Sequence, residues 1–412
     1  MSGEILFLAH RLPFPPDRGD KIRSHHILKA LAELAPVHVA TFADSKADWE
    51  SEGELAGVAA SHCLRPRSKW LPLAGAQALL RREPVSLSAF RDSALAAYVE
   101  QVLATRNIAT VYVFSGQMGQ YVPAHFEGRV VVDLVDVDSA KFEAYAAKKG
   151  WPAGWVDARE GRLLRREEER LAHLADETLL VSEAEADLLR SRLAEPGKAS
   201  ITALGNGIDT MLFDPAAVAP HSFLAGSTGP QIAFTGQMDY APNIAAARRV
   251  IDTILPAIRK HHPRAMFHIV GRAPVREVRA CDCKQGVRVW GEVPDVKPFL
   301  AGADIVIAPL DIARGIQNKV LEAMAMARPV VLTPGAASGI GATDGTHFAV
   351  EEDDAALVAR ILALVANRGA AQAMGRAARS FVVERQSWPA VLADLPRIVG
   401  FAGGSRGGRD AA

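Results

Sequence analysis

The sequence has few cysteines, no excess of charge of either sign and no long apolar run. Its three cysteines, Cys63, Cys281 and Cys283, are too few for a disulfide framework and indicate a reducing compartment. Cys281 and Cys283 have no second pair at metal-ligand spacing, which argues against a zinc site. Basic and acidic residues both number 47, so no overall positive field would attract nucleic acid.

The chain also lacks the ~20 consecutive apolar residues that a membrane-spanning helix requires. The apolar run at residues 4–9 is too short for a signal peptide core, and no basic region precedes it. We therefore expect a soluble, cytoplasmic protein that is at most peripheral to a membrane, at its inner face.

The length of 412 residues predicts two domains, because a single core rarely grows beyond ~250–300 residues. Short apolar runs alternate with helical patterns in both halves, which is typical of an α/β fold with doubly wound parallel sheets. The strands expected in the first half are 4–9, 37–41, 110–114, 129–135, 178–182 and 199–203, and the helices are 21–35, 93–106, 158–175 and 183–193. The strands expected in the second half are 231–235, 266–270, 286–290, 304–308, 329–333 and 347–350.

The expected organisation is an N-terminal domain at 1–205, a linker at 206–230, a C-terminal domain at 231–385, a C-terminal helix at 386–401 and a disordered tail at 402–412. Two such domains joined by one linker leave a cleft between them. Ligands of such sheets bind beyond the carboxyl ends of the strands.

The segment 304–332 carries the clearest chemical signal. A strand is followed by a loop with Arg314 and Gly315, and then by a helix whose free N–H groups and dipole suit a phosphate. Lys319 adds charge at the same place, and Glu322 is one turn into the helix, where it could accept hydrogen bonds from ribose hydroxyls. Spacing alone leaves open an ordinary strand–helix–strand crossover with a solvated charged loop.

This segment resembles the donor-domain signature of glycosyltransferase family 4, in which a glycine loop leads into a helix reading Leu-Glu-Ala-Met-Ala and then Pro-Val-Val. Other pieces match in the same order: 205–209 with 213–215, 234–243, 269–272 and 291–295. The resemblance implies a GT-B fold, in which two Rossmann-like doubly wound domains face a central cleft. It also implies retaining transfer of a sugar from a nucleoside diphosphate sugar, UDP- or GDP-linked.

Residues 10–21 and 314–319 further resemble a subgroup of sugar transferases associated with PEP-CTERM/exosortase and exopolysaccharide loci. That likeness implies exopolysaccharide or cell-surface glycan biosynthesis, with a glycan or lipid-linked acceptor. Nucleic acid, a metal and a cofactor other than the donor substrate are not implied.

The resemblance also implies the site residues. The catalytic residues are Asp136, Arg314, Lys319 and Glu322. The donor-binding residues lie on loops after strands and at the start of the helix: Gly19, Asp20, Gly236, Gln237, Asn243, Gly271, Gly315, Ile316, Gln317, Asn318, Val320 and Leu321.

The chain departs from the family at the donor site. Of the two family glutamates eight positions apart, Glu322 keeps the second, whereas Arg314 replaces the first. The family's Arg and Lys, which meet the diphosphate, fall at Gln237 and Asn243. We hypothesise that Arg314 and Lys319 neutralise the diphosphate instead, because leaving-group charge must be stabilised. The alternative is an impaired donor site.

Carboxylates cluster after the strand at 129–135. Asp133, Asp136 and Asp138 suit acid/base or hydroxyl-binding work, and Asp136 aligns with a family histidine that touches the sugar. Capping of the next helix by Asp138 or Ser139 stays open as the simpler interpretation.

An aromatic and basic patch follows, with Tyr145, Lys148, Lys149, Trp151 and Trp155. It suits a membrane surface or a lipid-linked acceptor, or a plain covering loop.

Two rival functions also remain: a nucleotide-sugar 2-epimerase on the same fold, and a non-catalytic nucleotide-sugar-binding scaffold.

Overall fold

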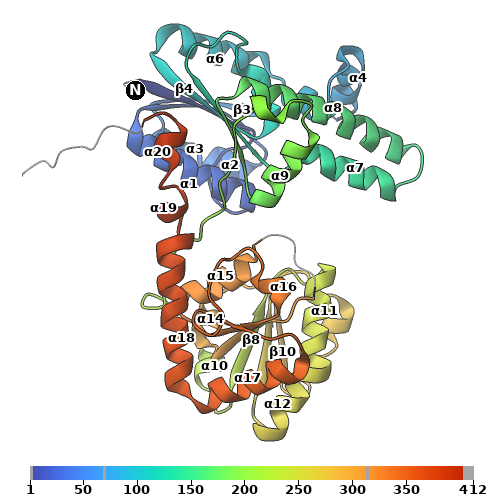
Figure 1. Cartoon of the computed structure of the whole chain (residues 1–412), viewed down its shortest axis with the longest axis vertical. Helices are drawn as coiled ribbons and strands as arrows, with labels where there is room; N and C mark the ends of the chain where they lie inside the picture. The colour runs from blue at the N-terminus through green and yellow to red at the C-terminus, as the bar shows by residue number, and fades with distance from the viewer. Residues whose placement is uncertain (1–2, 68–70, 312–315, 402–412) are drawn as a thin grey trace, which may run out of the picture. The chain divides into compact units, whose positions relative to one another are not determined.

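The computed structural model describes residues 3–67, 71–311 and 316–401. The chain divides into two compact units (Figure 1). The N-terminal unit contains Met1–Asn206 and Val391–Ala412, and the C-terminal unit is Gly207–Ala390.

The described part of the N-terminal unit contains a seven-stranded parallel sheet in the order β3-β2-β1-β4-β5-β6-β7. Its strands are β1 Glu4–Ala9, β2 Val37–Ala43, β3 Ser61–Pro66, β4 Ile108–Phe114, β5 Arg129–Val135, β6 Glu177–Leu180 and β7 Ile201–Ala203. Ile5 of β1 pairs with Val37 on one side and with Thr110 on the other. The strand order therefore reverses direction between β1 and β4.

Strand β3 was not expected from the sequence. It lies at the edge of the sheet, and Leu64 is its one buried residue. A strand with so little buried surface needs no apolar run, so its sequence carries no strand signal. The other strands of this sheet confirm the predicted positions, with ends that differ by a few residues.

The helices of the N-terminal unit that cover this sheet include α1 Gly19–Leu34 and α6 Ser93–Thr105, both as predicted. Helices α7 Asp138–Lys148 and α8 Ala153–Leu174 form an antiparallel hairpin (Figure 1). The remaining α-helices before residue 200 are α2 Lys46–Glu50, α3 Glu52–Val58, α4 Leu71–Arg81, α5 Val85–Ala89 and α9 Glu183–Arg192.

The C-terminal unit has a six-stranded parallel sheet in the order β10-β9-β8-β11-β12-β13. Its strands are β8 Gln231–Thr235, β9 Met266–Val270, β10 Val287–Gly291, β11 Ile305–Ala308, β12 Val330–Leu332 and β13 Ala349–Val350, all at predicted places. Its α-helices are α10 Ser222–Ala225, α11 Ala241–Arg249, α12 Leu255–His261, α13 Arg276–Arg279, α14 Lys297–Gly302, α15 Asn318–Ala325, α16 Pro334–Ala337, α17 Asp354–Ala366 and α18 Arg368–Phe381. One continuous core of buried apolar residues includes Phe234, Phe267, Ile307 and Leu321.

The predicted single helix at 386–401 is wrong. The segment holds two short helices, α19 Trp388–Val391 and α20 Leu395–Ile398, and each has a proline in its first turn. Proline lacks an N–H group and clashes with the carbonyl four residues earlier, so one helix cannot run through Pro396.

The end of the described chain packs on the N-terminal sheet. Thr110 Oγ1 donates to the Val399 carbonyl at 2.9 Å, and Arg129 donates to the Ile398 carbonyl at 2.5 Å. The predicted tail at 402–412 lies outside the described residues. Within the described ranges, every helix is too short or too polar to cross a bilayer.

Candidate functional site

Three neighbouring strands of the C-terminal sheet end at glycines with positive φ. Gly236 follows β8 (φ 150°), Gly271 follows β9 (φ 151°) and Gly291 ends β10 (φ 70°). A Cβ on Gly271 would lie 1.7 Å from the Gly236 carbonyl oxygen, so only glycine fits there. The backbone of these turns is therefore open to close approach by other groups.

Two polar side chains fill the space beside the first turn. A Cβ on Gly236 would lie 2.9 Å from Nδ2 of Asn243 and 3.0 Å from Nζ of Lys319. Asn243 lies in the first turn of α11 and Lys319 in the first turn of α15. The two helix beginnings therefore meet at the carboxyl end of β8.

A pocket of about 530 Å³ opens at this edge of the sheet. Its lining comes from the loops after β8, β9 and β10 and from the start of α15, and includes these predicted residues: Gly236, Gln237, Asn243, Gly271, Ile316, Gln317, Asn318, Lys319 and Glu322. The order of the strands reverses between β8 and β11, and α15 follows β11 in the chain. The pocket thus lies where parallel α/β sheets bind ligands, beyond the strand ends at a topological switch point.

Lys319 brings a positive charge to the lining of the pocket. Its ammonium donates to Oδ1 of Asn243 and lies 4.8 Å from the centre of the Phe234 ring. Among the residues that the structure describes, none forms an ion pair with Lys319, and Glu322 is the acidic group whose charge acts on it. Burial lowers the pKa of Lys319 to about 8, although the charge of Glu322 opposes the shift. A ligand phosphate would supply the missing negative charge.

Glu322 lies one turn further along α15 and also lines the pocket. Burial raises the pKa of its carboxyl group, and the charge of Lys319 acts in the opposite direction. Because Glu322 lies one turn after the start of α15 and lines the pocket, its carboxylate can accept hydrogen bonds from hydroxyl groups of a ligand.

Arg272 is a pocket residue that the sequence reasoning missed. It follows Gly271, and its guanidinium donates to Oε1 of Gln237 at 2.9 Å. The resemblance places a family Arg and Lys at Gln237 and Asn243. In this chain each of these uncharged side chains instead contacts a cation from another element, Arg272 or Lys319. The Gly-Arg pair after β9 was the available sequence signal.

Two of the predicted donor-binding residues have buried side chains. Val320 is fully buried and Leu321 is 1% exposed, and both belong to the core of the C-terminal unit. Their side chains lie on the inner face of α15, so they hold the helix in place and do not reach the pocket. Arg314 and Gly315 lie outside the described residues.

Asp20, a candidate on the N-terminal unit, is already paired. It accepts from Arg11 Nη1 at 2.5 Å and lies 3.3 Å from His10 Nε2. Burial alone would raise the pKa of Asp20, but the hydrogen bonds with His10 and Arg11 outweigh it and hold the pKa well below its usual range. Asp20 is therefore a fixed negative charge rather than a general base. Gly19 begins α1, and a Cβ there would meet no atom within 4 Å.

Asp136 follows β5, directly after a residue with an unusual backbone conformation. Val135 has φ 70°, which is rare for a β-branched residue and is a feature of functional sites. The Asp136 carboxylate accepts from Lys141 Nζ at 2.8 Å. It is half-buried, so the structure leaves it within reach of a ligand.

Asp133 has a different role from that suggested by the cluster of carboxylates. It is fully buried and accepts from Arg23 at 3.0 and 3.2 Å and from the Tyr112 hydroxyl at 3.0 Å. Arg23 also donates to the Gly205 carbonyl at 2.9 Å and to Oδ1 of Asn206 at 3.0 Å. Asp133 therefore holds the centre of the N-terminal unit together.

The α7 cap also differs from the prediction. Val137 occupies the N-cap position, and Glu168 of α8 accepts from the Ser139 backbone N–H at 2.8 Å. A carboxylate from the facing helix thus accepts a hydrogen bond from a free N–H group at the N-terminus of α7. Neither the Asp138 nor the Ser139 side chain caps this helix.

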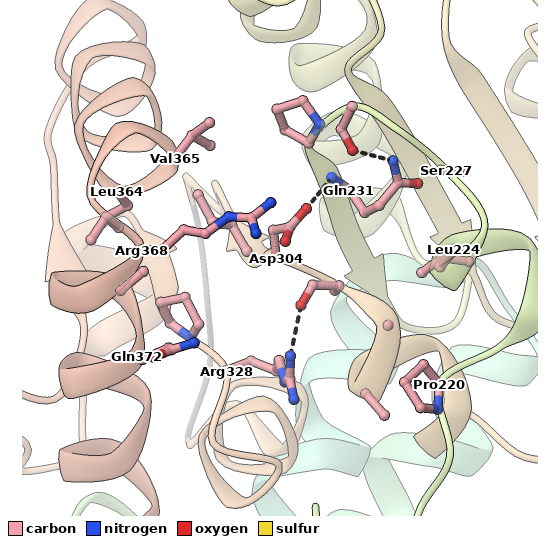
Figure 2. Close-up of a pocket in the computed structure, with 18 of the residues that line it drawn as sticks. Pro220, Leu224, Ser227, Gln231, Asp304, Arg328, Leu364, Val365, Arg368 and Gln372 are labelled. Carbon is pink, nitrogen blue, oxygen red and sulfur yellow. Dashed lines mark hydrogen bonds between the residues drawn. The ribbon is translucent and has the colours of Figure 1, made fainter.

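A second cavity, of about 720 Å³, lies at the opposite edge of the C-terminal sheet (Figure 2). It is lined by the beginnings of β8 and β11. Asp304 accepts from the Gln231 backbone N–H at 2.8 Å, and Arg328 donates to the Ala303 carbonyl at 3.1 Å (Figure 2). Because ligands of parallel α/β sheets bind at the carboxyl ends of the strands, we assign the site to the other edge.

Residues 229–367 match the sequence model of the family described as "Glycosyl transferases group 1", and this range contains the whole pocket. These residues therefore resemble a group 1 glycosyltransferase domain. The family 4 resemblance of the donor half is thereby confirmed at the level of this family.

Relatives support the same assignment. Over 264 residues the chain is 25% identical to the glycogen synthase of Mycobacterium tuberculosis, covering 62% of this chain and 61% of that protein. The chain thus spans less than two thirds of the length of the curated relatives that it matches.

Two solved structures share the fold along nearly the whole chain. Anabaena Alr3699/HepE in complex with UDP and glucose has a TM-score of 0.59 at 14% identity, covering 97% of this chain and 99% of that one. Sucrose-phosphate synthase from Thermosynechococcus elongatus has a TM-score of 0.60 at 16% identity, covering 96% and 98%. Together with the two parallel sheets, these likenesses confirm the predicted GT-B fold class.

Proposed function

We propose that this protein is a retaining glycosyltransferase that takes its sugar from a UDP-linked donor. One observation carries the proposal: the pocket of the group 1 domain places Lys319 and Arg272 beside the two glycine turns at the ends of β8 and β9. That arrangement suits a diphosphate, which needs positive charge and close backbone approach. UDP is the nucleotide to test first, since UDP is bound in the similar Anabaena structure.

The proposed chemistry needs charge stabilisation more than a dedicated base. As the sugar leaves, negative charge develops on the diphosphate, and fixed cations stabilise it without reorganising. Lys319, Arg272 and the start of α15 would supply this charge. Glu322 would hold the ribose hydroxyls, and the departing diphosphate would assist the incoming hydroxyl on the same face of the sugar. We keep Arg314 as a proposed further cation, on the resemblance alone.

The acceptor side rests on the N-terminal unit. We propose that Asp20 and Asp136 orient the acceptor or the transferred sugar, because both are charged residues that follow strands at the carboxyl edge of that sheet. The acceptor proposed from the resemblance is a glycan or a lipid-linked glycan, made in the cytoplasm at the inner face of the membrane. The pathway proposed is exopolysaccharide or cell-surface glycan synthesis of the PEP-CTERM/exosortase-associated kind.

The first experiment is thermal stabilisation of the full chain by UDP, GDP, UDP-glucose and GDP-mannose. A ligand at 100 times its Kd stabilises a protein by about 2.7 kcal/mol, which is easily measured. We expect the ligands with one of the two bases, uracil or guanine, to stabilise the wild-type protein. The same ligands should not stabilise the Lys319→Ala or Glu322→Ala variant. Arg368→Ala is the matched control, because Arg368 lines the cavity at the other edge of the sheet. No shift with any nucleotide would contradict the proposed donor site.

Turnover separates transfer from the alternatives. A transferase releases UDP and moves the sugar to an acceptor or, slowly, to water. A 2-epimerase would convert the donor to its C2 epimer. A scaffold would bind the donor without releasing UDP, and the replacement of the family's first glutamate by Arg314 is the observation that favours it.

A further inference from the structure

The N-terminal unit exposes large apolar side chains at one end of the α7–α8 hairpin. Trp151, in the turn between the helices, is 86% exposed, and Trp155, in the first turn of α8, is 54% exposed. Tyr145, near the end of α7, is 50% exposed. Soluble proteins rarely leave several large apolar side chains exposed in one short segment unless another surface covers them.

Helix α4 also exposes large apolar side chains. Its Leu80 is 86% exposed and Leu79 is 57% exposed. Arg159 of α8 donates to the carbonyls of Ala78 at 3.0 Å and Glu83 at 3.2 Å, so the end of α4 lies against α8 (Figure 1).

Trp155 precedes Arg159 by one helical turn and therefore shares its face of α8. We call the exposed apolar side chains at this end of the hairpin, together with those at the neighbouring end of α4, the aromatic edge: Tyr145, Trp151, Trp155, Leu79 and Leu80.

Basic residues flank the aromatic edge. Lys148 and Lys149 end the α7 region, and Arg81 and Arg82 end the α4 region, and all four are exposed. Lys149 pairs with Asp157 at 2.7 Å and lies 5.6 Å from the centre of the Tyr145 ring, which holds the cation beside the aromatic side chains.

We propose that the aromatic edge docks on the surface of a bilayer that contains anionic lipids. Tryptophan and tyrosine rings have an apolar body and a polar tip, and they prefer the headgroup region of a bilayer. Lysine and arginine beside them are attracted to anionic headgroups, and their apolar stems lie along the boundary. A surface with aromatic and basic residues therefore suits the headgroup region of the bilayer and the negative charge of its anionic lipids.

A second copy of the chain fits the same edge less well. A symmetric dimer would place the patch against itself. Lys148, Arg81 and Arg82 would then face the same three side chains of the other copy, and like charges across an interface oppose association. An anionic surface has no such conflict.

The test is co-sedimentation of the full chain with vesicles of phosphatidylcholine alone and with about 30% phosphatidylglycerol, in about 0.1 M salt. We expect binding to the anionic vesicles, and at least ~tenfold weaker binding for the double variant Trp151→Ala with Trp155→Ala. The matched control is Trp49→Ala, because Trp49 is 42% exposed on α2 of the same unit. Lys148→Glu with Lys149→Glu should also weaken binding and remove most of its salt dependence.

Failure to bind anionic vesicles would overturn the proposal, as would equal binding by the wild type and the tryptophan double variant. Sedimentation velocity tests the rival: a concentration-dependent dimer that disappears in the double variant, without vesicle binding, would assign the edge to a second copy. The variants should keep the wild-type melting temperature, since both side chains are exposed. The outcome is independent of the donor site, which nucleotide-induced stabilisation reports separately.

Discussion

The ammonium of Lys319 donates a hydrogen bond to the side-chain oxygen of Asn243, which precedes it by 76 positions. The resemblance places a family lysine at position 243, so the cation is supplied from α15 to the same neighbourhood. The N-terminal unit has an analogous long-range link, in which Arg23 joins Asp133 to the chain at residues 205–206.

Replacement of Lys319 by alanine should weaken donor binding. A hydrogen bond to a charged group is worth about 1.5–3 kcal/mol, so we expect a loss of about 10- to 100-fold in affinity for UDP. Titration calorimetry with UDP measures it, and Arg368→Ala should bind as the wild type does. An unchanged Kd would remove Lys319 from the donor site.

Donor affinity should also fall above neutral pH. The pKa of Lys319 is about 8 in the folded protein, because burial disfavours its charged form. Above that pH, Lys319 of the unliganded protein has lost the proton that gives it the positive charge needed for diphosphate binding. Affinity should therefore weaken by up to ~tenfold per pH unit until the pKa of the bound state is reached.

The matched variant for this pH effect is Lys319→Arg, whose guanidinium stays charged. Its UDP affinity should be nearly constant from about pH 7 to 9.5, provided that it binds. A wild-type affinity that does not change over this range would contradict the assigned role of the Lys319 charge.

Arg272→Ala should weaken donor binding by about 3- to 10-fold, less than the loss at Lys319, because Arg272 is exposed and solvent screens its charge. The informative variant adds Gln237→Arg in the same chain, which restores the residue that the family resemblance places there. We expect this second change to recover most of the lost affinity in calorimetry. If Arg272→Ala binds UDP as the wild type does, Lys319 contributes to diphosphate binding and Arg272 does not.

Arg23→Ala should destabilise the protein strongly. It would leave the Asp133 carboxylate buried without its cation, and removal of one partner from a buried ion pair costs about 3–5 kcal/mol. Urea unfolding followed by circular dichroism measures the loss. The double variant Arg23→Met with Asp133→Leu should lose less than Arg23→Ala, because no buried charge remains. A loss below ~1 kcal/mol in Arg23→Ala would show that water reaches Asp133.

Acid should destabilise the protein through His268. Burial, followed by the charges of His221 and Arg288, lowers the pKa of His268 to about 4. The unfolded chain binds a proton here below about pH 6.5, whereas the folded chain does not until about pH 4. The unfolded state therefore binds more protons in this window, and stability falls as the pH falls, by up to ~1.4 kcal/mol per unit.

His268→Gln tests this contribution. Glutamine keeps a donor for Gln231 and an acceptor for the Trp290 N–H, which lie 2.8 and 3.1 Å from the two ring nitrogens. The variant should unfold with a smaller dependence on pH between about 4 and 6.5 in parallel urea titrations. An identical dependence in both proteins would place the acid sensitivity elsewhere.

Most of the strands and the donor signature were predictable from the sequence, because both are local. A buried parallel strand needs a short continuous apolar run, as in Ile305–Ala308. A turn whose backbone other groups can approach closely needs glycine directly after the strand, as at Gly236 and Gly271. Strand β3 was missed because an edge strand with one buried residue leaves no such pattern.

Only the tertiary structure decided which side chains meet. Asp133 looked like part of a reactive cluster, but it is the buried partner of Arg23, 110 positions earlier. Val320 and Leu321 stand within the donor signature, yet the rotation of α15 turns them into the core while Lys319 and Glu322 line the pocket. By itself the sequence determined the strand pattern and the order of the motifs, since these depend on neighbouring residues. The pairing of Lys319 with Asn243 and of Arg272 with Gln237 depended on how distant loops come together at one edge of a sheet.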